Sequence, residues 1–358
     1  MKNRDKLWIP LIAVVMGLLL GIIILLLSGK DVIALFTSLI KGFIGIDLLK
    51  GGSVNLRYPG ELIVTLLPIT LTGLAIGFAY RTGLFNIGAE GQVIVGSLVA
   101  VIVSILVPMP NIIGQIVVLC CGGIAGALYA FIPGYLKTKF NISEVVTGIM
   151  LNYSALYSAN YFIKALPGST KTRTVDIPET ANLGSEFLKS ISNNSRLNYG
   201  FIVLIIALFV YWFIIEKTTF GYSLRATGYN KEGARYAGIK VNRNIIYSMM
   251  ISGLFSGLAG AIITQGTFGY GRVMTSMDNY GFDGIAVALV GGGNAIGILV
   301  SGLLFSVLSV TQPLMQTVGI PKDIGEIIAS SIVFFVAIQY AIKLLLNKIK
   351  VKKNREVK

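Results

Sequence analysis

The sequence predicts an all-α integral membrane protein with about ten transmembrane helices, on three observations: few charges, repeated apolar segments and the placement of basic residues. Of 358 residues, 54% are hydrophobic and only 13% are charged. A soluble globular protein carries about 25% charged residues. So few charges could not cover the surface of a soluble chain of this length. Lipid is therefore the predicted solvent for most of these side chains.

The apolar segments give the number of spans. A membrane helix needs about 20 apolar residues, within a range of about 17–25. Nine segments reach this length, and a shorter tenth, 280–292, is rich in glycine. The predicted spans are 7–27, 61–80, 91–107, 112–136, 145–163, 199–215, 244–265, 280–292, 295–311 and 324–345. No soluble domain fits between them, so residues 1–358 form one predicted transmembrane domain.

The first span, 7–27, is longer than the apolar core of a signal peptide, so we expect it to be retained.

The charge distribution predicts the orientation. The formal net charge is +14, and much of it lies at the start of the chain, in 217–243 and in 343–358. Basic residues that flank spans stay in the cytoplasm. Ten spans place both termini and the connection 216–243 inside. The outer connection 164–198 also carries five basic residues, but nine spans would put the more basic tail outside.

The residue inventory excludes several function classes. The chain has no histidine, and its two cysteines, Cys120 and Cys121, are adjacent. A zinc or haem site, a histidine-based triad and a disulfide framework are therefore not expected. No Gly-x-x-x-x-Gly-Lys-Ser/Thr loop occurs, so we expect no nucleotide site and no cofactor on this chain. A membrane-embedded enzyme would need convergent catalytic groups that the sequence does not offer.

Two runs rich in glycine and polar residues interrupt the apolar pattern, at 81–92 and 279–294. Interrupted segments at corresponding positions of two halves indicate a transport site. Their amide and carboxyl groups could bind a polar solute, and their rings offer flat apolar faces. The candidate substrate-pathway residues are Phe85, Asn86, Glu90, Gln92, Phe282, Asp283 and Asn294.

A structural interpretation of these runs stays open. Glycine lets membrane helices approach closely, and Glu90 could be a turn residue in water at the inner surface. An ionisable group inside the bilayer is usually functional, so the depth of Glu90 and Asp283 decides between the structural and the functional interpretation. Asn152 is more typical of a bond between helices than of a ligand contact. The small-residue run 122–127 predicts close helix packing.

The inner connection 216–243 predicts a short helix. Asn230 is a good N-cap, and Gly238 could end the helix that follows. A structured helix in a cytoplasmic connection is typical of a docking element. The alternative is a basic segment that rests on anionic lipid.

Three motifs resemble permease subunits of general nucleoside ABC importers. The run 85–92, Phe-Asn-Ile-Gly-Ala-Glu-Gly-Gln, is the most specific. The other two occur more widely, in ribose and branched-chain amino acid permeases as well. They are the inner-loop pattern of Arg225, Ala226, Gly228 and Asn230 followed by Ala237, Gly238 and Ile239, and the run 281–289. The sequence after Leu289, Val-Gly-Gly-Gly, departs from the charged or polar residue that relatives often carry.

The resemblance implies two pseudo-repeated halves, alternating access and a place in the plasma membrane of a prokaryote. It implies four partners: a cytoplasmic ABC ATPase that hydrolyses the ATP, a second homologous permease, an extracytoplasmic substrate-binding lipoprotein and a nucleoside. The binding protein would dock on 164–198 and 266–279. The ATPase-coupling residues would be Arg225, Ala226, Gly228, Asn230, Ala237, Gly238 and Ile239. An ion-coupled secondary transporter of a small polar solute is the alternative function.

Overall fold

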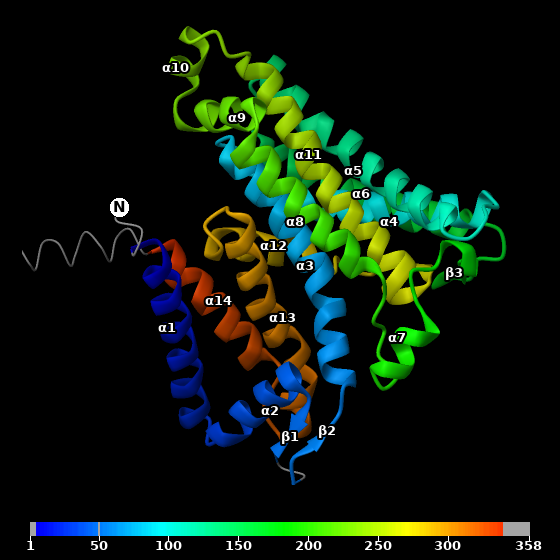
Figure 1. Cartoon of the computed structure of the whole chain (residues 1–358), viewed down its shortest axis with the longest axis vertical. Helices are drawn as coiled ribbons and strands as arrows, with labels where there is room; N and C mark the ends of the chain where they lie inside the picture. The colour runs from blue at the N-terminus through cyan, green and yellow to red at the C-terminus, as the bar shows by residue number, and fades with distance from the viewer. Residues whose placement is uncertain (1–4, 49–50, 339–358) are drawn as a thin grey trace, which may run out of the picture.

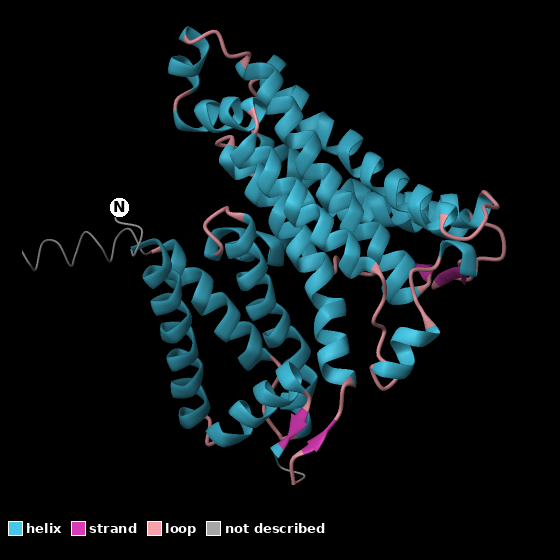
Figure 2. Cartoon of the chain, in the orientation of Figure 1, coloured by secondary structure: helices cyan, strands magenta, loops and turns pink. Residues whose placement is uncertain are grey.

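The computed structural model describes residues 5–48 and 51–338, and this part of the chain is mostly helical (Figure 1; Figure 2). The longer helices are α1 (Asp5–Leu27), α2 (Val32–Ile44), α3 (Arg57–Arg81), α4 (Ala89–Leu106), α5 (Ile113–Phe140), α6 (Glu144–Ala165), α8 (Gly200–Lys217), α9 (Thr219–Tyr229), α11 (Val241–Ile262), α12 (Tyr280–Val290), α13 (Ala295–Thr317) and α14 (Asp323–Ala337). Two helices are short, α7 (Glu186–Ile191) and α10 (Lys231–Tyr236). A 3-10 turn covers Glu179–Ala181, and α11 continues as a π-helical turn over Ile263–Phe268.

Two small antiparallel sheets lie outside the helices. Strand β1 (Ile46–Asp47) pairs with β2 (Ser53–Val54). Strand β3 (Arg173–Asp176) pairs with β4 (Tyr270–Arg272). The second pairing joins two connections that are almost one hundred residues apart.

Each of the ten predicted spans coincides with a helix, although the predicted end of the last one, 345, lies outside the described residues. Six helices in the described ranges are long and apolar enough to cross a membrane: α3, α4, α5, α8, α13, and α11 together with its π turn. The others are shorter, less apolar or described only in part. The number of ten crossings therefore stays a prediction.

Helices α3 and α11 form the centre of the molecule. Helix α3 packs against α12 and α13, and α11 packs against α4 and α5. The small-residue run 122–127 lies at one of these contacts, as predicted, because Gly122 and Gly126 of α5 face Gly253 and Gly257 of α11. A Cβ at any of the four would collide with the facing helix. Two Gly-x-x-x-Gly patterns thus bring the two backbones together, as is common between membrane helices.

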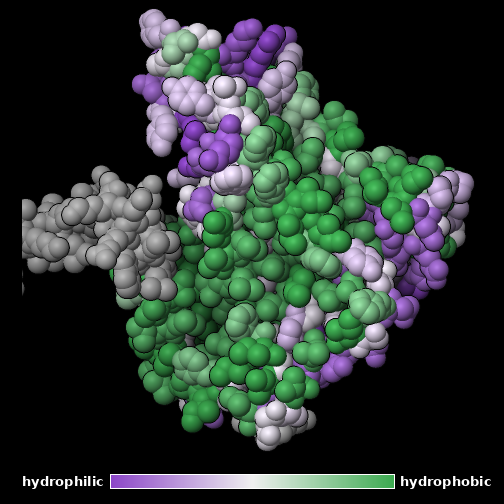
Figure 3. All heavy atoms as spheres, viewed as in Figure 1, coloured by the Kyte–Doolittle hydropathy of each residue, from purple (hydrophilic) through white to green (hydrophobic). Residues whose placement is uncertain are grey.

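The surface separates into hydrophobic and hydrophilic zones. In the face drawn in Figure 3, a broad hydrophobic band covers the helices, and hydrophilic residues gather around α9 and α10 at one end and around the β3 region at the other. Large apolar side chains of α5 and α8 are exposed, among them Leu128 and Ile205. This arrangement fits a chain whose middle lies in lipid and whose two ends lie in water.

Candidate functional site

The first interruption is a short non-helical segment between α3 and α4. Helix α3 ends at Arg81, Gly83 adopts a positive φ of 72°, and α4 begins at Ala89. The positive φ favours glycine because it has no Cβ. The non-helical segment 82–88 therefore follows the sequence prediction of an interrupted helix, and together with the first turn of α4, residues 89–92, it is the first break.

Two predicted pathway residues of the first break hydrogen-bond each other. Asn86 Nδ2 donates to Gln92 Oε1 at 2.9 Å, and Gln92 Nε2 donates to Asn86 Oδ1 at 3.1 Å. Asn86 Nδ2 also donates to Ser252 Oγ of α11 at 2.7 Å, and Ser252 Oγ donates to the Ala75 carbonyl at 2.6 Å. All three side chains are buried. This closed network holds the break against α3 and α11 and leaves its amides little capacity for a solute.

Asn152 of α6 closes the break from the other side. The backbone N–H of Gly91 donates to Asn152 Oδ1 at 2.7 Å, and Asn152 Nδ2 donates to the Ile87 carbonyl at 3.0 Å. The predicted role of this residue, a bond between helices, is confirmed. Its amide satisfies backbone groups that the interruption of the helix leaves free, which lipid could not do.

Glu90 joins the first break to the second. Its Oε1 accepts from the backbone N–H of Asn279 at 3.0 Å, and its Oε2 accepts from the backbone N–H of Gly281 at 2.5 Å. Glu90 is 1% exposed, so the alternative of a turn residue in water is wrong. A carboxylate at a helix N-terminus binds free N–H groups and is favoured by the helix dipole. Glu90 therefore caps α12.

The second predicted run, 279–294, is helical over most of its length, because 280–290 is the short helix α12 of 11 residues and only the turn 291–294 follows it. The chain is non-helical just before α12, over 273–279, and this segment together with the first turn of α12, residues 280–283, is the second break. Thr72 Oγ1 donates to the Tyr280 carbonyl at 2.8 Å. Thr72 lies nine residues before Arg81, so α12 begins about 14 Å from the C-terminal end of α3 at 1.5 Å per residue. Gly281 is pressed against the Glu90 backbone, where a Cβ would collide. The two breaks thus meet near the middle of α3.

Of the predicted residues, Phe282 and Asn294 are exposed and Phe85 and Asp283 are partly buried; Asn294 lies away from the meeting point of the two breaks. Phe282 is 38% exposed, and Asp283 is only partly buried. Within the described ranges, the Asp283 carboxylate has no side-chain hydrogen bond, whereas the carboxylate of Glu90 has two. Phe85 is half-buried. The first residues of α12 are therefore the ones that a solute could reach.

Asn294 is placed away from this point, at the turn between α12 and α13. It is the N-cap of α13, because its Oδ1 accepts from Gly297 N at 2.8 Å while its Nδ2 donates to the Gly291 carbonyl at 2.8 Å. Tyr211 of α8 donates from its hydroxyl to the Gly293 carbonyl at 2.8 Å. The structure gives Asn294 a capping role, and the Gly-rich turn lies beside Arg81 at the C-terminal end of α3.

The predicted ATPase-coupling residues lie around two helices. Arg225, Ala226 and Gly228 belong to α9, which the sequence did not predict, whereas the predicted short helix after Asn230 is α10 and is followed by Ala237, Gly238 and Ile239. The predicted N-cap is confirmed, because Asn230 Oδ1 accepts from Gly233 N at 2.9 Å. Gly238 has a φ of 79° just after α10. The sequence missed α9 because its glycines and threonines do not suggest a helix, which packing supplies.

Helix α9 packs directly on the first break. Gly228 lies against the Arg81 carbonyl, where a Cβ would collide, and Gly83 lies against Gly228. Glu216 forms ion pairs with both Arg81 and Arg225. Because these residues connect α9 to the end of α3, a displacement of α9 would act on the break.

A second set of contacts seats α9 and α10 on the helices. Ala226 and Ile239 pack against a cluster that contains Ala79 and Leu84. Asn244 Nδ2 donates to Thr227 Oγ1 at 3.0 Å. These are specific protein contacts, so a segment that rests only on lipid is not what the described residues form.

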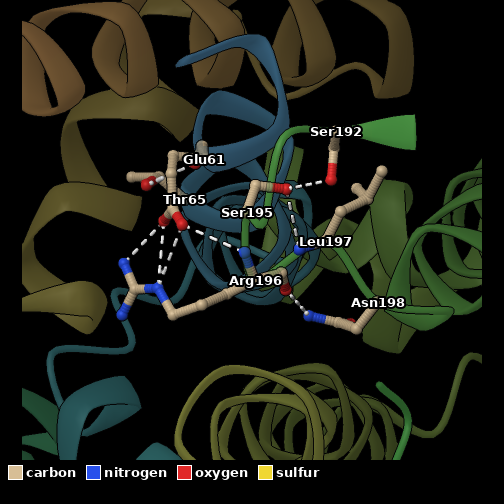
Figure 4. Close-up of polar contacts among 7 residues, drawn as sticks. All are labelled: Glu61, Thr65, Ser192, Ser195, Arg196, Leu197 and Asn198. Atoms are coloured by element: carbon tan, nitrogen blue, oxygen red, sulfur yellow. Dashed lines mark hydrogen bonds and ion pairs between the residues drawn. The ribbon is translucent and has the colours of Figure 1, made fainter. Parts of the chain in front are cut away.

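The connections 164–198 and 266–279 form one platform. Strand β3 comes from the predicted loop 164–198 and β4 from the loop 266–279, so the two candidate docking loops are one structure. Figure 4 shows how the first loop is fixed to α3: Arg196 Nη2 lies 2.7 Å from Glu61 Oε2, and the Arg196 backbone N–H donates to Glu61 Oε1 at 3.0 Å. The hydrogen bond to Glu61 raises the pKa of Arg196 above its usual value, so the guanidinium stays charged.

Comparison with known proteins is in line with this architecture. The family described as branched-chain amino acid transport system / permease component matches residues 58–342. The chain belongs to this permease family. It is 42% identical to the guanosine ABC transporter permease protein NupP of Bacillus subtilis, over 98% of this chain and 99% of that protein. It is 37% identical to the nucleoside ABC transporter permease protein NupB of Lactococcus lactis, over 99% and 98%.

A more distant relative comes from the same bacterium as the first. The guanosine ABC transporter permease protein NupQ of Bacillus subtilis is 28% identical, over 73% of this chain and 83% of that protein. No solved structure matches the chain.

Proposed function

We propose that this permease is the membrane-spanning subunit of an ATP-driven importer of nucleosides. The full-length similarity to guanosine and nucleoside permeases supports the substrate class. The observation that carries the coupling is the contact of α9 with the first break, through Gly228 and Arg81. A secondary transporter would not need such a docking element, so the ion-coupled alternative is disfavoured.

The membrane arrangement is part of this proposal. All ten helices that coincide with predicted spans cross the membrane or enter it, and both termini lie in the cytoplasm. Helices α3 and α11 each pack against two further helices, α3 against α12 and α13, and α11 against α4 and α5. This correspondence supports two related halves. In the proposed topology α3 runs inward and α11 outward, so the repeat is an inverted one, as in many transporters.

Three proteins complete the transporter. A cytoplasmic ABC ATPase docks on α9 and α10, and a binding lipoprotein docks on the β3–β4 platform. A second, homologous permease lies beside this chain in the membrane. The presence of two different guanosine permease proteins in one relative's organism supports such a pair.

The proposed mechanism is alternating access. Nucleotide binding and hydrolysis move α9, the contact of Gly228 with Arg81 passes the displacement to the first break, and Glu90 passes it to the N-terminus of α12. The solute then meets Phe282 or Phe85 as a stacking face and Asp283 as an acceptor for base or sugar N–H and O–H groups. The ring stack would stabilise a bound base by about 1–3 kcal/mol. Asn86, Gln92 and Asn294 shape the site and bind no solute.

A co-purification experiment tests the proposal. The chain is isolated from solubilised membranes, and the proteins that come with it are identified. We expect an ABC ATPase that is lost when Arg225, Gly228 and Asn230 are all replaced, and guanosine uptake that needs ATP and survives an ionophore. A chain that purifies alone and transports under an ion gradient would contradict the proposal.

A further inference from the structure

Helix α6 has one face that the described residues leave uncovered. Its buried face packs on α4 through a cluster that includes Ala155, Ala159 and Ile163. On the opposite face Tyr153, Tyr157 and Tyr161 follow one another at intervals of four residues, and are 54%, 69% and 71% exposed. Residues four apart share one face of a helix, so the three rings form a ladder along α6.

Two of the three rings lie too deep to be part of an interfacial belt, whereas Tyr161, about 6 Å from the end of α6 at Ala165, lies near that level. Helix α6 has 22 residues, the length of a span, but it is not among the six described helices that are apolar enough to cross a membrane. Tyr153 lies about 14 Å from the inner end of α6 and Tyr157 about 12 Å from the outer end, at 1.5 Å per residue. Tyrosines of the interfacial belt sit at the headgroup level.

The hydroxyl groups of the ladder need a polar partner. In the part of the chain that the structure describes, none of the three has a hydrogen bond, whereas Tyr129 donates to the Leu151 carbonyl. An unpaired hydroxyl in hydrocarbon is unfavourable. Two exposed serines, Ser154 and Ser158, lie beside the rings. Lipid is therefore a poor neighbour for this face.

Both ends of the ladder are joined to the breaks. Near its inner end Asn152 holds the first break, as described above. Near its outer end Asn160 Nδ2 donates to the Met274 carbonyl at 2.7 Å, and Met274 N donates to Asn160 Oδ1 at 2.8 Å. Met274 also lines an outer cavity of about 340 Å³, together with Arg272 and Asp278. The ladder thus leads from an outer opening toward the depth at which α12 begins.

We infer that this face of α6 lines the nucleoside path, with a second permease subunit as the opposite wall. The inference rests on the proposed function and extends it to residues outside the two breaks. Tyrosine combines a ring on which a base can stack with a hydroxyl that can bond a sugar or base edge. Three such rings at a spacing of about 6 Å offer successive stacking positions for one permeant.

Cysteine labelling tests the inference in the assembled transporter. Cys120 and Cys121 are first replaced by alanine, and Tyr157→Cys is compared with Ile205→Cys on α8. Ile205 is 62% exposed on an apolar face and serves as the matched lipid-facing control. Because a thiolate forms in water and is disfavoured in apolar surroundings, a charged methanethiosulfonate reagent should modify position 157 at least about tenfold faster than position 205. Guanosine should slow that reaction.

Each outcome decides between the possible surroundings of the face. Labelling of position 157 as slow as that of position 205 would show that lipid or a sealed protein contact covers the ladder, and would overturn the inference. Fast labelling that guanosine does not slow would show water without the permeant, and would also overturn it. Guanosine uptake by the cysteine-free parent is measured beside the labelling: its absence would refute the proposed function, whereas uptake without labelling refutes only the role of α6.

Discussion

The two breaks have a similar pattern of polar and aromatic residues, but they differ in which side chains remain exposed or without a hydrogen bond. The first break buries Asn86 and Gln92 in a closed network with Ser252, and Asn152 covers it from α6. The second leaves Phe282 partly exposed and the Asp283 carboxylate without a side-chain hydrogen bond in the described part of the chain. Similar polar patterns thus serve different ends. In the proposed mechanism the first break is the joint that receives the ATPase movement, and the second faces the solute.

Glu90 is the point where the two breaks depend on each other. Its carboxylate belongs to the first and its two hydrogen bonds go to the second. Three sets of contacts link α9 to the N-terminus of α12: Gly228 with Arg81, the closed amide network, and Glu90 with α12. Substitutions of Glu90, Gly228 and Asn86 would each break one of these links.

Removal of Glu90 should have the largest effect. Glu90→Ala deletes two hydrogen bonds to a charged group, each of which contributes about 1.5–3 kcal/mol. We expect the free energy of unfolding to fall by about 3–5 kcal/mol and nucleoside uptake to fall to background. Glu90→Gln keeps one acceptor and should be intermediate. Thermal unfolding in detergent and uptake by cells check both variants, and parental stability with parental uptake in Glu90→Ala would show that Glu90 does not hold α12.

Gly228→Ala should separate the ATPase from the break. The added Cβ collides with the Arg81 carbonyl, and such overpacking costs about 1–3 kcal/mol. We expect the ATPase to co-purify while the stimulation of ATP hydrolysis by guanosine and binding protein is lost. Gly319→Asn, in the turn after α13, is the control, because its Cβ meets open space and asparagine tolerates a positive φ. Normal stimulation in Gly228→Ala would rule out this contact as the coupling route.

The amide network should behave as one unit. Asn86→Ala and Ser252→Ala each leave buried partners unsatisfied, which costs about 1–3 kcal/mol. The two residues share a hydrogen bond, so the double variant should lose less stability than the sum of the two single losses. A double-mutant cycle on thermal unfolding measures the difference, and strict additivity would mean that the network does not act together.

The outer ion pair should matter least. Arg196 is about half exposed and its backbone N–H also bonds Glu61, so Arg196→Ala should cost about 1 kcal/mol or less. Glu61→Ala removes both contacts and should cost more. Unfolding of the two variants at low and high salt checks this order. A larger loss of unfolding free energy in Arg196→Ala than in Glu61→Ala would contradict the minor role of the Arg196 side chain.

The sequence predicted local features well. The lengths of the apolar segments predicted ten helices, Asn230 was predicted as a helix cap, and the small residues of 122–127 predicted a close helix contact. Pairings between distant residues were out of reach: nothing near Glu90 in the chain indicates that its partners are Asn279 and Gly281. The β3–β4 pairing and the packing of α9 on Arg81 are of the same kind. Such contacts depend on how the helices assemble, which residue patterns along one helix do not contain.

The concentration dependence of guanosine uptake in Phe282→Ala and Asn86→Ala tests the contrast between the breaks most directly. The loss of a stacking face worth about 1–3 kcal/mol should raise the KM of Phe282→Ala by about 5- to 150-fold. Asn86→Ala should lower the unfolding temperature and leave the KM within about twofold, because its amide bonds protein groups. A raised KM with normal stability in Asn86→Ala, beside an unchanged KM in Phe282→Ala, would contradict the account.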